Sequence, residues 1–221
     1  MKTSIIVASM NRPAMLEECL RRIRETTVRL DIEVICVIDE DQRSWDVAWN
    51  FIDSGIFNKK RIGTIEAFNQ GLKLSTGDII FPLGDDSYCH PGWLDKALEV
   101  HQNILKGYGM VAMNDLMLDG DTQLGTTVLY DRKFCRDWLG SVAAYPVYHY
   151  YYIDNELNER AKRAGKYIWC KEAIVEHIHS SNNKRPIDEN DSNRAGFMEL
   201  DKIIFEERKA AGFPNNFPGS I

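Results

Sequence analysis

The chain has 221 residues, of which 44% are hydrophobic, so it is long enough to bury a substantial core. Its formal net charge of −6 argues against a basic surface that coats nucleic acid. The five cysteines are odd in number, widely spaced and never arranged as Cys-x-x-Cys, which argues against a disulfide framework and against a zinc knuckle.

The chain shows no targeting or membrane-spanning segment. Its N-terminal apolar run, Ile5 to Ala8, is too short for a signal peptide. No apolar stretch reaches the roughly 18 residues of a membrane span. We therefore expect a cytoplasmic protein with one domain over residues 1–221.

Strand and helix signals alternate through the first part of the chain. Short apolar runs predict buried strands at residues 3–8, 32–38 and 79–83. A first helix is expected from Pro13, with one apolar face made of Leu16, Cys19, Leu20 and Ile23. A second helix contains Trp45 and Trp49, which we assign to packing on the sheet rather than to a stacking platform for a ligand. A third is expected to run from Thr64 to Leu74.

Acidic residues follow two of the predicted strands. Asp39 ends the second strand, and the adjacent Asp85 and Asp86 stand on the turn that follows the strand 79–83. In open α/β sheets ligands bind at the carboxyl ends of the strands, and paired carboxylates there can hold a divalent cation that in turn holds a diphosphate. The alternative is an acidic turn that only stays solvated.

The pattern changes after Leu94. A helix to about residue 105 precedes two β-rich runs, which we expect to be antiparallel and peripheral. After an aromatic-rich stretch, a helix is expected from Asp154 to Gly165, followed by two short strands and a polar loop that we expect to be mobile. The β-rich runs cover residues 109–118 and 126–134, the aromatic stretch 137–152, the short strands 167–170 and 174–178, and the loop 180–193.

A last amphipathic helix is marked by Phe197, Leu200, Ile204 and Arg208 and ends at Gly212, and the tail from 213 to 221 has no period. The order of elements predicts an α/β fold with a mainly parallel sheet, helices on both faces and a small antiparallel portion.

With these elements in order, the chain resembles the family 2 glycosyltransferases, nucleotide-sugar enzymes of the GT-A fold. The resemblance covers most of residues 1–180. Its most specific part is GTIEAFNQGLKLSTGDIIFPLGDDSYCHPGWL, which is similar to the family pattern A-x-N-x-G…GD…D-x-D…PGWL. SIIVASMNRP and EVICVIDED match the first two strands and their turns. IDNELNERAKRAGKYIWCKEAIVEH matches E-D-x-[DE]-L-x-x-R-x-x-x-x-G…H.

The resemblance implies a nucleotide-binding half at residues 1–94, an acceptor half at 95–180, and a loop, helix and tail at 181–221. Asp39 would recognise the base. Asp86, the last position of the D-x-D triplet, would bind Mn²⁺ or Mg²⁺, whereas Gly84 stands where the first acid is expected. His177 would complete the metal shell, with His179 as a nearby rival. The implied nucleotide contacts are Ser9, Asn11, Arg12, Asp39, Arg61, Gly63, Asn69, Asp85 and Asp86.

The resemblance also places the catalytic base at Asp154, with Ile153 in place of the usual Glu. Asp154 would take the proton from an acceptor hydroxyl in a single inverting displacement. The alternative role, that of helix N-cap, is compatible with it. Arg160 matches the Arg of the pattern, and a surface ion pair with Glu156 is its alternative.

The residues of the aromatic stretch are candidates for stacking on an acceptor, with core packing as the alternative. Lys184 and Arg185 are candidates for closing over the phosphates, although an ordinary solvated loop is favoured.

The implied function is metal-dependent, inverting transfer of a sugar from a nucleotide sugar, expected to be a UDP-sugar. The acceptor is a hydroxyl of a glycan, a protein, a small molecule or, less favoured, a modified base in nucleic acid. One alternative is a nucleotidyltransferase that makes a nucleotide sugar, although its Gly-rich phosphate loop is absent. Another is a catalytically silent nucleotide- or carbohydrate-binding module, because the first acid of the triplet is missing. The presence of Asp86, Asp154 and His177 argues against it.

Overall fold

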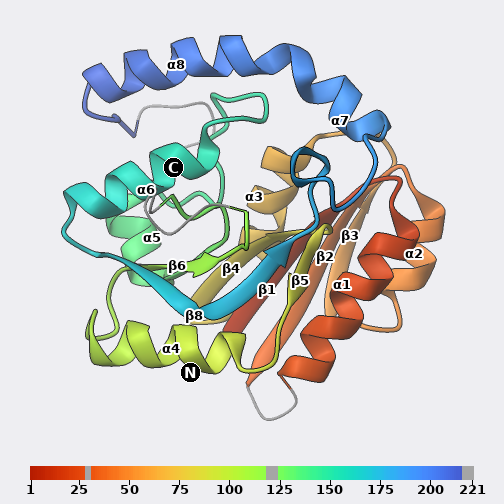
Figure 1. The fold of residues 1–221 in the computed structure, drawn as a ribbon, viewed down its shortest axis with the longest axis horizontal. Coiled ribbons are helices and arrows are strands. Elements are labelled where there is room, and N and C mark those ends of the chain that lie inside the picture. Colours follow the sequence, from red (N-terminus) through yellow and green to blue (C-terminus); the bar gives the residue numbers. More distant parts are fainter. Residues whose placement is uncertain (28–30, 118–123, 216–221) are drawn as a thin grey trace.

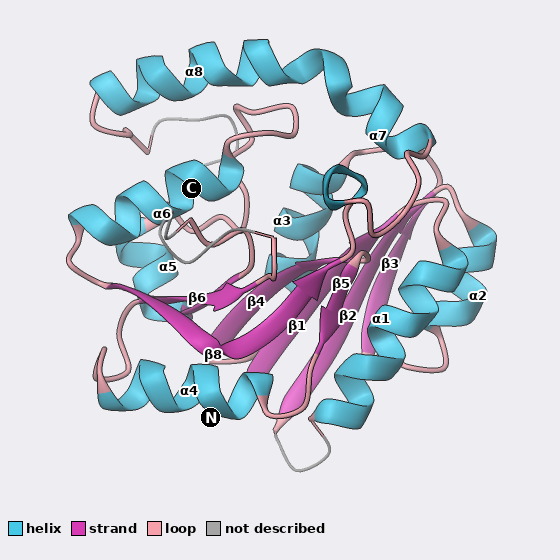
Figure 2. Cartoon of the chain, in the orientation of Figure 1, coloured by secondary structure: helices cyan, strands magenta, loops and turns pink. Residues whose placement is uncertain are grey.

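The computed structural model describes residues 1–27, 31–117 and 124–215. In these ranges, eight strands form one sheet in the order β3-β2-β1-β4-β7-β6-β8-β5 (Figure 2). The strands are β1 (Thr3–Ser9), β2 (Ile32–Asp39), β3 (Ser54–Asn58), β4 (Ile79–Gly84), β5 (Ser87–Cys89), β6 (Met110–Asn114), β7 (Val128–Asp131) and β8 (Tyr167–His177). The predicted fold class is confirmed.

Helices cover both faces of this sheet (Figure 1). The α-helices are α1 (Pro13–Thr26), α2 (Gln42–Ala48), α3 (Thr64–Leu74), α4 (Trp93–Asn103), α5 (Arg132–Trp138), α6 (Ile153–Arg163), α7 (Glu189–Arg194) and α8 (Met198–Ala210). The 3₁₀ helices are η1 (Ser180–Asn182) and η2 (Ala195–Phe197). The longest described helix, α1, has 14 residues, and none of the described helices is both long and apolar enough to cross a bilayer.

The first half of the chain folds as its periodicity predicts. β1 pairs in parallel with β2 and β4, and β2 pairs in parallel with β3. Helix α1 begins at Pro13 and buries the four predicted residues, Leu16, Cys19, Leu20 and Ile23. The sequence predicts no strand at β3, because this edge strand is partly exposed along its length and lacks a clear apolar run.

Two hydrophobic cores lie on opposite faces of the sheet. Trp93 of α4 packs with α1 against one face, whereas Phe134 of α5 and Leu157 of α6 belong to the core on the other face. Helix α3 joins the second core and lies very close to the sheet, because a Cβ at Gly71 would lie 2.2 Å from a methyl carbon of Ile6. The glycine of the A-x-N-x-G pattern is therefore required by helix–sheet packing.

The expectation that the runs 109–118 and 126–134 are peripheral is wrong. They form β6 and β7 in the interior of the sheet, between β4 and β8, and Met110 to Ala112 are fully buried. The pairing of β7 with β4 and β6 is antiparallel, as expected. The second run ends early because Asp131 caps the unpredicted helix α5 by accepting a hydrogen bond from Phe134 N at 2.8 Å. Residue 118 lies outside the described residues.

The two short strands predicted at 167–170 and 174–178 are one strand, β8. Its register shifts at a bulge where β6 passes from Met113 to Asn114. Strand β8 runs parallel to β6, and its last part pairs antiparallel with β5. Strand β5 has only three residues, which is too short for a periodic signal, and the sequence predicts a turn there.

The polar segment 180–193 contains η1 and α7 rather than an irregular loop. Figure 1 shows α7 above the carboxyl ends of β1 and β2. Helix α8 follows, but its buried residues are Asp201, Phe205 and Arg208, whereas Leu200, expected in the apolar face, is 50% exposed. Phe213, at the start of the predicted tail, packs in the core, and residues 216–221 lie outside the described residues.

Candidate functional site

Two adjoining cavities lie where the strands end. The smaller, about 130 Å³, is called here the strand-end cavity, and the larger, about 510 Å³, the aromatic cavity. Four residues line both cavities: Thr64, Gly84, Asp86 and Tyr150. The two spaces therefore meet at the turn after β4.

Most of the predicted nucleotide contacts line the strand-end cavity. They are Ser9, Arg12, Asp39, Arg61, Gly63, Asp85 and Asp86. Asn11 lies beside the cavity but is exposed, and it adopts a left-handed backbone with a φ of 56°. The structure does not bring Asn69 to the cavity. Its buried amide instead holds Ala143 N, Ala144 N and Ala144 O, which fixes the loop after α5.

Asp39 shapes one wall of the strand-end cavity. Its Oδ2 accepts hydrogen bonds from Ile62 N and Gly63 N, both at 2.9 Å. Its Oδ1 accepts one from Asn58 Nδ2 at 3.0 Å. Because the carboxylate ends β2 and fixes the chain before α3, it sets the position of Gly63 and its neighbours around the cavity.

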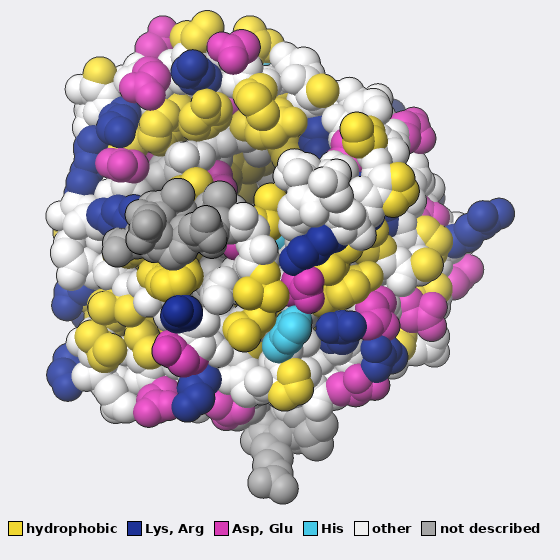
Figure 3. All heavy atoms as spheres, viewed as in Figure 1, with side chains coloured by type: hydrophobic (Ala, Val, Ile, Leu, Met, Phe, Trp, Pro, Cys, Tyr) yellow, Lys and Arg dark blue, Asp and Glu magenta, His cyan; other side chains and the backbone are white. Residues whose placement is uncertain are grey.

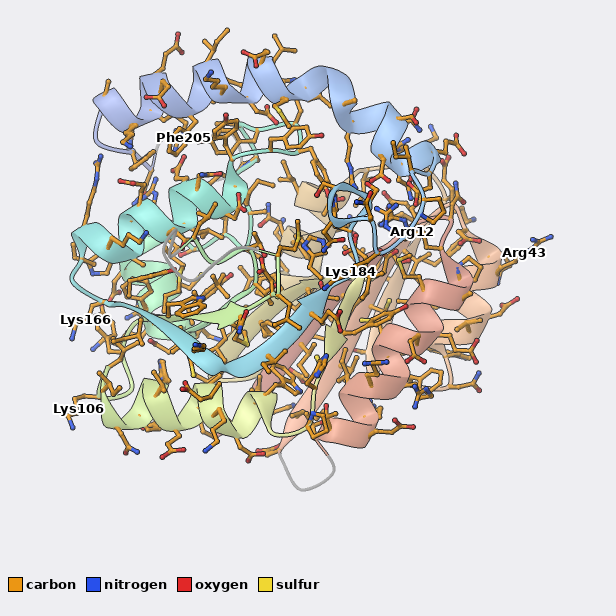
Figure 4. All side chains as sticks on the ribbon, in the orientation of Figure 1. Arg12, Arg43, Lys106, Lys166, Lys184 and Phe205 are labelled. Carbon is orange, nitrogen blue, oxygen red and sulfur yellow. The ribbon has the colours of Figure 1, made fainter. Side chains whose placement is uncertain are left out.

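Arg12, labelled in Figure 4, contacts acids that follow β4 and also Asp188, which precedes α7. Its Nη1 lies 3.1 Å from Asp85 Oδ1 and 3.3 Å from Asp86 Oδ2, while its Nε donates to Asp188 Oδ2 at 2.7 Å. Ser9 Oγ also donates to Asp85, at 2.7 Å. Burial and the neighbouring Asp86 raise the pKa of Asp85, although Arg12 and Ser9 oppose this shift. Both carboxylate oxygens of Asp85 are therefore occupied by hydrogen bonds from Ser9 and Arg12.

Asp86 faces His177, with Oδ1 at 3.3 Å from Nε2. The pairing of Ser87 with His177 between β5 and β8 brings them together. Burial alone would raise the pKa of Asp86, but His177 and Arg12 lower it. Burial would lower the pKa of His177, but Asp86 raises it. The predicted rival, His179, is in ring contact with His177 and accepts a hydrogen bond from Ser181 N, so His177 is the histidine that faces Asp86.

The donors at this point fit a divalent cation that takes only two ligands from the protein. An oxygen of Asp86 and a nitrogen of His177 suit Mn²⁺ or Mg²⁺, which share their remaining positions with substrate phosphates and water. Within residues 1–27, 31–117 and 124–215, no group of three His, Cys, Asp or Glu side chains is arranged to hold a metal ion. A cation here would therefore need ligands from the substrate.

A Cβ at Gly84 would lie 2.7 Å from Asp86 Oδ1. The missing first acid of the triplet thus leaves room for the Asp86 carboxylate in its present position.

Asp154 lines the aromatic cavity, as do Asp86 and His177. The N-cap hypothesis for Asp154 is wrong, because Tyr152, with a φ of 64°, is the N-cap and Asp154 is the second residue of α6. The side chain of Asp154 is partly buried and accepts a hydrogen bond from Asn155 N at 2.9 Å. Burial raises its pKa above the ordinary value for Asp. This carboxylate is therefore a stronger base than an exposed one.

Glu156 does not face either cavity. It is fully buried, accepts a hydrogen bond from Tyr148 Oη at 2.6 Å, and forms ion pairs at 2.8 Å with Arg160 and Arg208. The alternative assignment of Arg160 to an ion pair with Glu156 is confirmed, although the pair is buried rather than on the surface. This cluster joins α6 to α8.

The segment from Ile178 to Phe197 covers the strand-end cavity and carries residues that the sequence did not predict as site residues. Asn190, Asn193, Arg194 and Phe197 line the cavity. Asp188 and Asp191 form a capping box at the start of α7. Their D-x-x-D spacing is the sequence signal that predicts this helix start.

Lys184 and Arg185 have different ion-pair partners. Lys184 lies 2.8 Å from Glu176 and so is paired away from the acids of the sheet, whereas Arg185 pairs with Asp191 and lies 3.8 Å from Asp86.

The aromatic stretch divides between core and cavity. Tyr145 and Tyr148 are in the core, while Tyr150, Tyr151 and Tyr152 line the aromatic cavity. The buried Asp201 of α8 holds this segment by accepting hydrogen bonds from three consecutive backbone amides, His149, Tyr150 and Tyr151, at 2.8–2.9 Å. Arg194 of α7 donates to Tyr150 Oη. The wall between the two cavities is therefore fixed from α7 and α8.

The family model described as Glycosyl transferase family 2 matches residues 4–114, which is half of the chain. A glucosyl-dolichyl phosphate glucuronosyltransferase of Haloferax volcanii is 26% identical over 110 residues, which are 47% of this chain and 35% of that protein. The chain thus spans about a third of the length of this curated relative.

Solved glycosyltransferase structures share the fold. The glucosyl-3-phosphoglycerate synthase of Mycobacterium tuberculosis, solved with Mn²⁺, UDP and phosphoglyceric acid, matches with a TM-score of 0.68 at 14% identity over 99% of this chain and 80% of that chain. The mannosyltransferase PcManGT of Pyrobaculum calidifontis, solved with GDP-Man and Mn²⁺, matches with a TM-score of 0.66 at 16% identity over 79% of this chain and 56% of that chain. These similarities show a GT-A fold.

Proposed function

This chain belongs to glycosyl transferase family 2, and we propose that it is an inverting, metal-dependent enzyme that transfers a sugar from a UDP-sugar to an acceptor hydroxyl. One observation carries the proposal. Asp86 lines both cavities, with His177 at 3.3 Å from it and Asp154 in the wall of the second cavity. A donor bound in one cavity and an acceptor bound in the other would meet beside these three side chains.

The strand-end cavity is assigned to the nucleoside diphosphate. Asp39 and the backbone at Gly63 form the end that would receive the base and ribose, while Arg12 and Arg194 supply positive charge for the phosphates. Two solved structures with this fold hold GDP-Man with Mn²⁺ and UDP with Mn²⁺. We favour a UDP-sugar, which is the donor that the family resemblance implies.

Asp86 and His177 would hold the divalent cation together with oxygens of the diphosphate. The bound cation would neutralise the negative charge that grows on the leaving diphosphate. Arg12 and Arg185 lie 3.3 and 3.8 Å from Asp86 and add positive charge beside the same group. These arginine side chains would therefore lie beside the leaving diphosphate rather than beside the acceptor.

Asp154 would act as the general base. Its carboxylate takes the proton of the acceptor hydroxyl while the hydroxyl oxygen bonds to the anomeric carbon, and the bond from that carbon to the diphosphate oxygen breaks on the opposite face. This single displacement inverts the anomeric configuration. The raised pKa of Asp154 supports the role, since a base is most effective when its pKa approaches the working pH.

The test is to incubate the protein with Mn²⁺ and a panel of UDP- and GDP-sugars, with a mixture of candidate acceptors, and to measure the released nucleoside diphosphate. We expect release that stops when a chelator is added and that is slowed in Asp154→Asn. Formation of pyrophosphate from UTP and a sugar 1-phosphate would instead indicate a nucleotidyltransferase. Metal-dependent UDP binding without any release would indicate a binding module.

A further inference from the structure

We propose that the aromatic cavity binds an uncharged acceptor, a hydroxyl compound with an aromatic or aliphatic body, and that it rejects phosphorylated and carboxylated acceptors. This rests on the proposed function, because it assumes that Asp154 marks the acceptor site. The charges, the surface and the rigidity of the cavity walls support it.

The described residues lining this cavity include no Lys and no Arg. The contrast with the neighbouring space is direct, because Arg12, Arg61 and Arg194 line the strand-end cavity. Proteins recognise phosphate and carboxylate groups mainly with arginine, lysine and clustered backbone amides. The chain therefore gathers its arginines where the diphosphate is expected and places none in the described walls of the acceptor cavity.

The charged side chains that face the aromatic cavity are acidic apart from two histidines, and at the N-terminus of α6, where an anion could otherwise bind, Asn155 N already donates to Asp154. Asp86 and Asp154 line it. His177 lies 3.3 Å from Asp86, so a positive charge on its ring would be paired with that carboxylate, and His179 is in ring contact with His177. A bound donor and its divalent cation would add charges that largely offset each other, so the carboxylates of Asp86 and Asp154 decide the sign of the charge in this cavity. An acceptor with a phosphate of its own would thus enter a space that already holds like charge.

Much of the remaining wall is apolar or aromatic, and its polar members, such as Thr126, Thr127 and Asn155, carry no charge. Phe68, Met117, Tyr151, Tyr152 and Met198 contribute large side chains to it. Figure 3 shows a hollow below α8 that is bordered by hydrophobic side chains. A volume of about 510 Å³ is in the range of sites that enclose drug-sized ligands. Aromatic rings or the CH faces of a sugar ring would pack on this wall with a hydroxyl directed to Asp154.

The wall is also preformed. Asp201 fixes the backbone amides of His149, Tyr150 and Tyr151, so the tyrosines need not be ordered when a ligand enters. A preorganised site loses less conformational entropy on binding. The cavity can therefore bind a neutral ligand by surface complementarity without a salt bridge.

Two probes that differ by one phosphate test this inference. Phenyl β-D-glucopyranoside and its 6-phosphate are titrated into the full chain with saturating UDP and diamagnetic Mg²⁺, and binding is followed by ligand-observed NMR. We expect the neutral probe to bind at least about 10-fold more tightly, which is about 1.4 kcal/mol of discrimination. Equal or tighter binding of the phosphate would overturn the inference, as would the absence of binding by the neutral probe at millimolar concentration.

A variant pair places the effect in this cavity. Met198 lies at the rim and is 47% exposed, so Met198→Arg adds a cation without disturbing the core, and Met198→Leu is the matched control. We expect the arginine variant to improve the relative affinity of the phosphate probe about 5-fold over the leucine variant, the size of a favourable exposed ion pair. An unchanged ratio would contradict binding in this cavity.

UDP affinity with Mg²⁺, measured by calorimetry on the same samples, keeps the two proposals apart. Loss of UDP binding would count against the proposed function. Tighter binding of the 6-phosphate, with UDP binding intact, would count only against the proposed class of acceptor.

Discussion

Asp86 Oδ1 lies 3.3 Å from His177 Nε2, at the point where β5 and β8 pair. Asp86 follows the parallel strand β4, and His177 ends β8, which lies next to the edge strand β5. Their contact joins the two cavities into one site, because Asp86 lines both of them.

UDP should bind more tightly with Mn²⁺ than with a chelator, because in the proposed function Asp86 and His177 would supply two ligands to the same cation. Asp86→Ala should remove this dependence. Asp85→Ala should keep it but lower the melting temperature, since Asp85 is buried and bonded to Ser9 and Arg12. Calorimetry and thermal denaturation check both. Equal UDP affinity with and without metal would remove the cation from the mechanism.

Asp154→Asn should slow sugar transfer by roughly 10²- to 10⁴-fold, because an amide does not accept the acceptor's proton. Donor affinity and melting temperature should change little, since Asp154 is not the N-cap of α6. Initial transfer rates and UDP affinity of the purified variant check this. Near-normal transfer would show that another group is the base.

Glu156→Gln, two residues further along, should lower the stability of the fold and leave the rate of sugar transfer near normal. The carboxylate is fully buried between Arg160 and Arg208, so its loss removes the negative charge that neutralises two buried cations, although both keep hydrogen bonds to backbone carbonyls. We expect a loss of about 3 kcal/mol in the free energy of unfolding. Transfer at a temperature where the variant is folded should remain near normal. Denaturant unfolding and rate measurements separate the two effects.

The transfer rate should rise with pH across the raised pKa of Asp154. Burial favours the protonated form of this carboxyl, and only the deprotonated form takes a proton. The lower limb of the profile of kcat/KM against pH should therefore lie above the ordinary Asp value of about 3.9. Asp154→Asn should lose this limb from its residual activity. A limb that persists unchanged in the variant would belong to another group.

Asp201→Asn should loosen the wall between the cavities. The carboxylate accepts three consecutive backbone amides, and the neutral amide side chain accepts them less strongly. We expect a loss of about 2 kcal/mol in stability, from weakened hydrogen bonds to a charged group. Glu199→Gln, an exposed change on the same helix, is the control. Equal stability of the two variants would contradict a clamping role.

The parts of the site that depend on local pattern follow from the sequence. Apolar runs and the turns after them place Asp39, Asp85 and Asp86 at strand ends, and the structure finds all three lining the strand-end cavity. Pro13 and the period of Leu16 and Leu20 likewise predict α1. These features are set by neighbours within a few residues, so periodicity is enough to detect them.

Other predictions failed where a residue's role depends on distant contacts. Asn69 lies in a family pattern but is used by the backbone at Ala143 and Ala144, far along the chain. The ion pair of Arg160 with Glu156 is present as predicted, but Arg208 of α8 joins it in a buried cluster rather than at the predicted surface. The interior position of β6 and β7 also depends on which strands pair with them.

The sequence by itself determined the order of the main strands and helices and the acids at the first sheet edge, because backbone preference and hydrophobic period act over short distances. Only the tertiary structure decided that α7 covers this edge, that Asp201 fixes the tyrosines, and that a three-residue strand, β5, brings His177 to Asp86. Such contacts join residues far apart in the chain. Their free energy comes from burial and charge pairing that exist only once all the strands have assembled into the sheet.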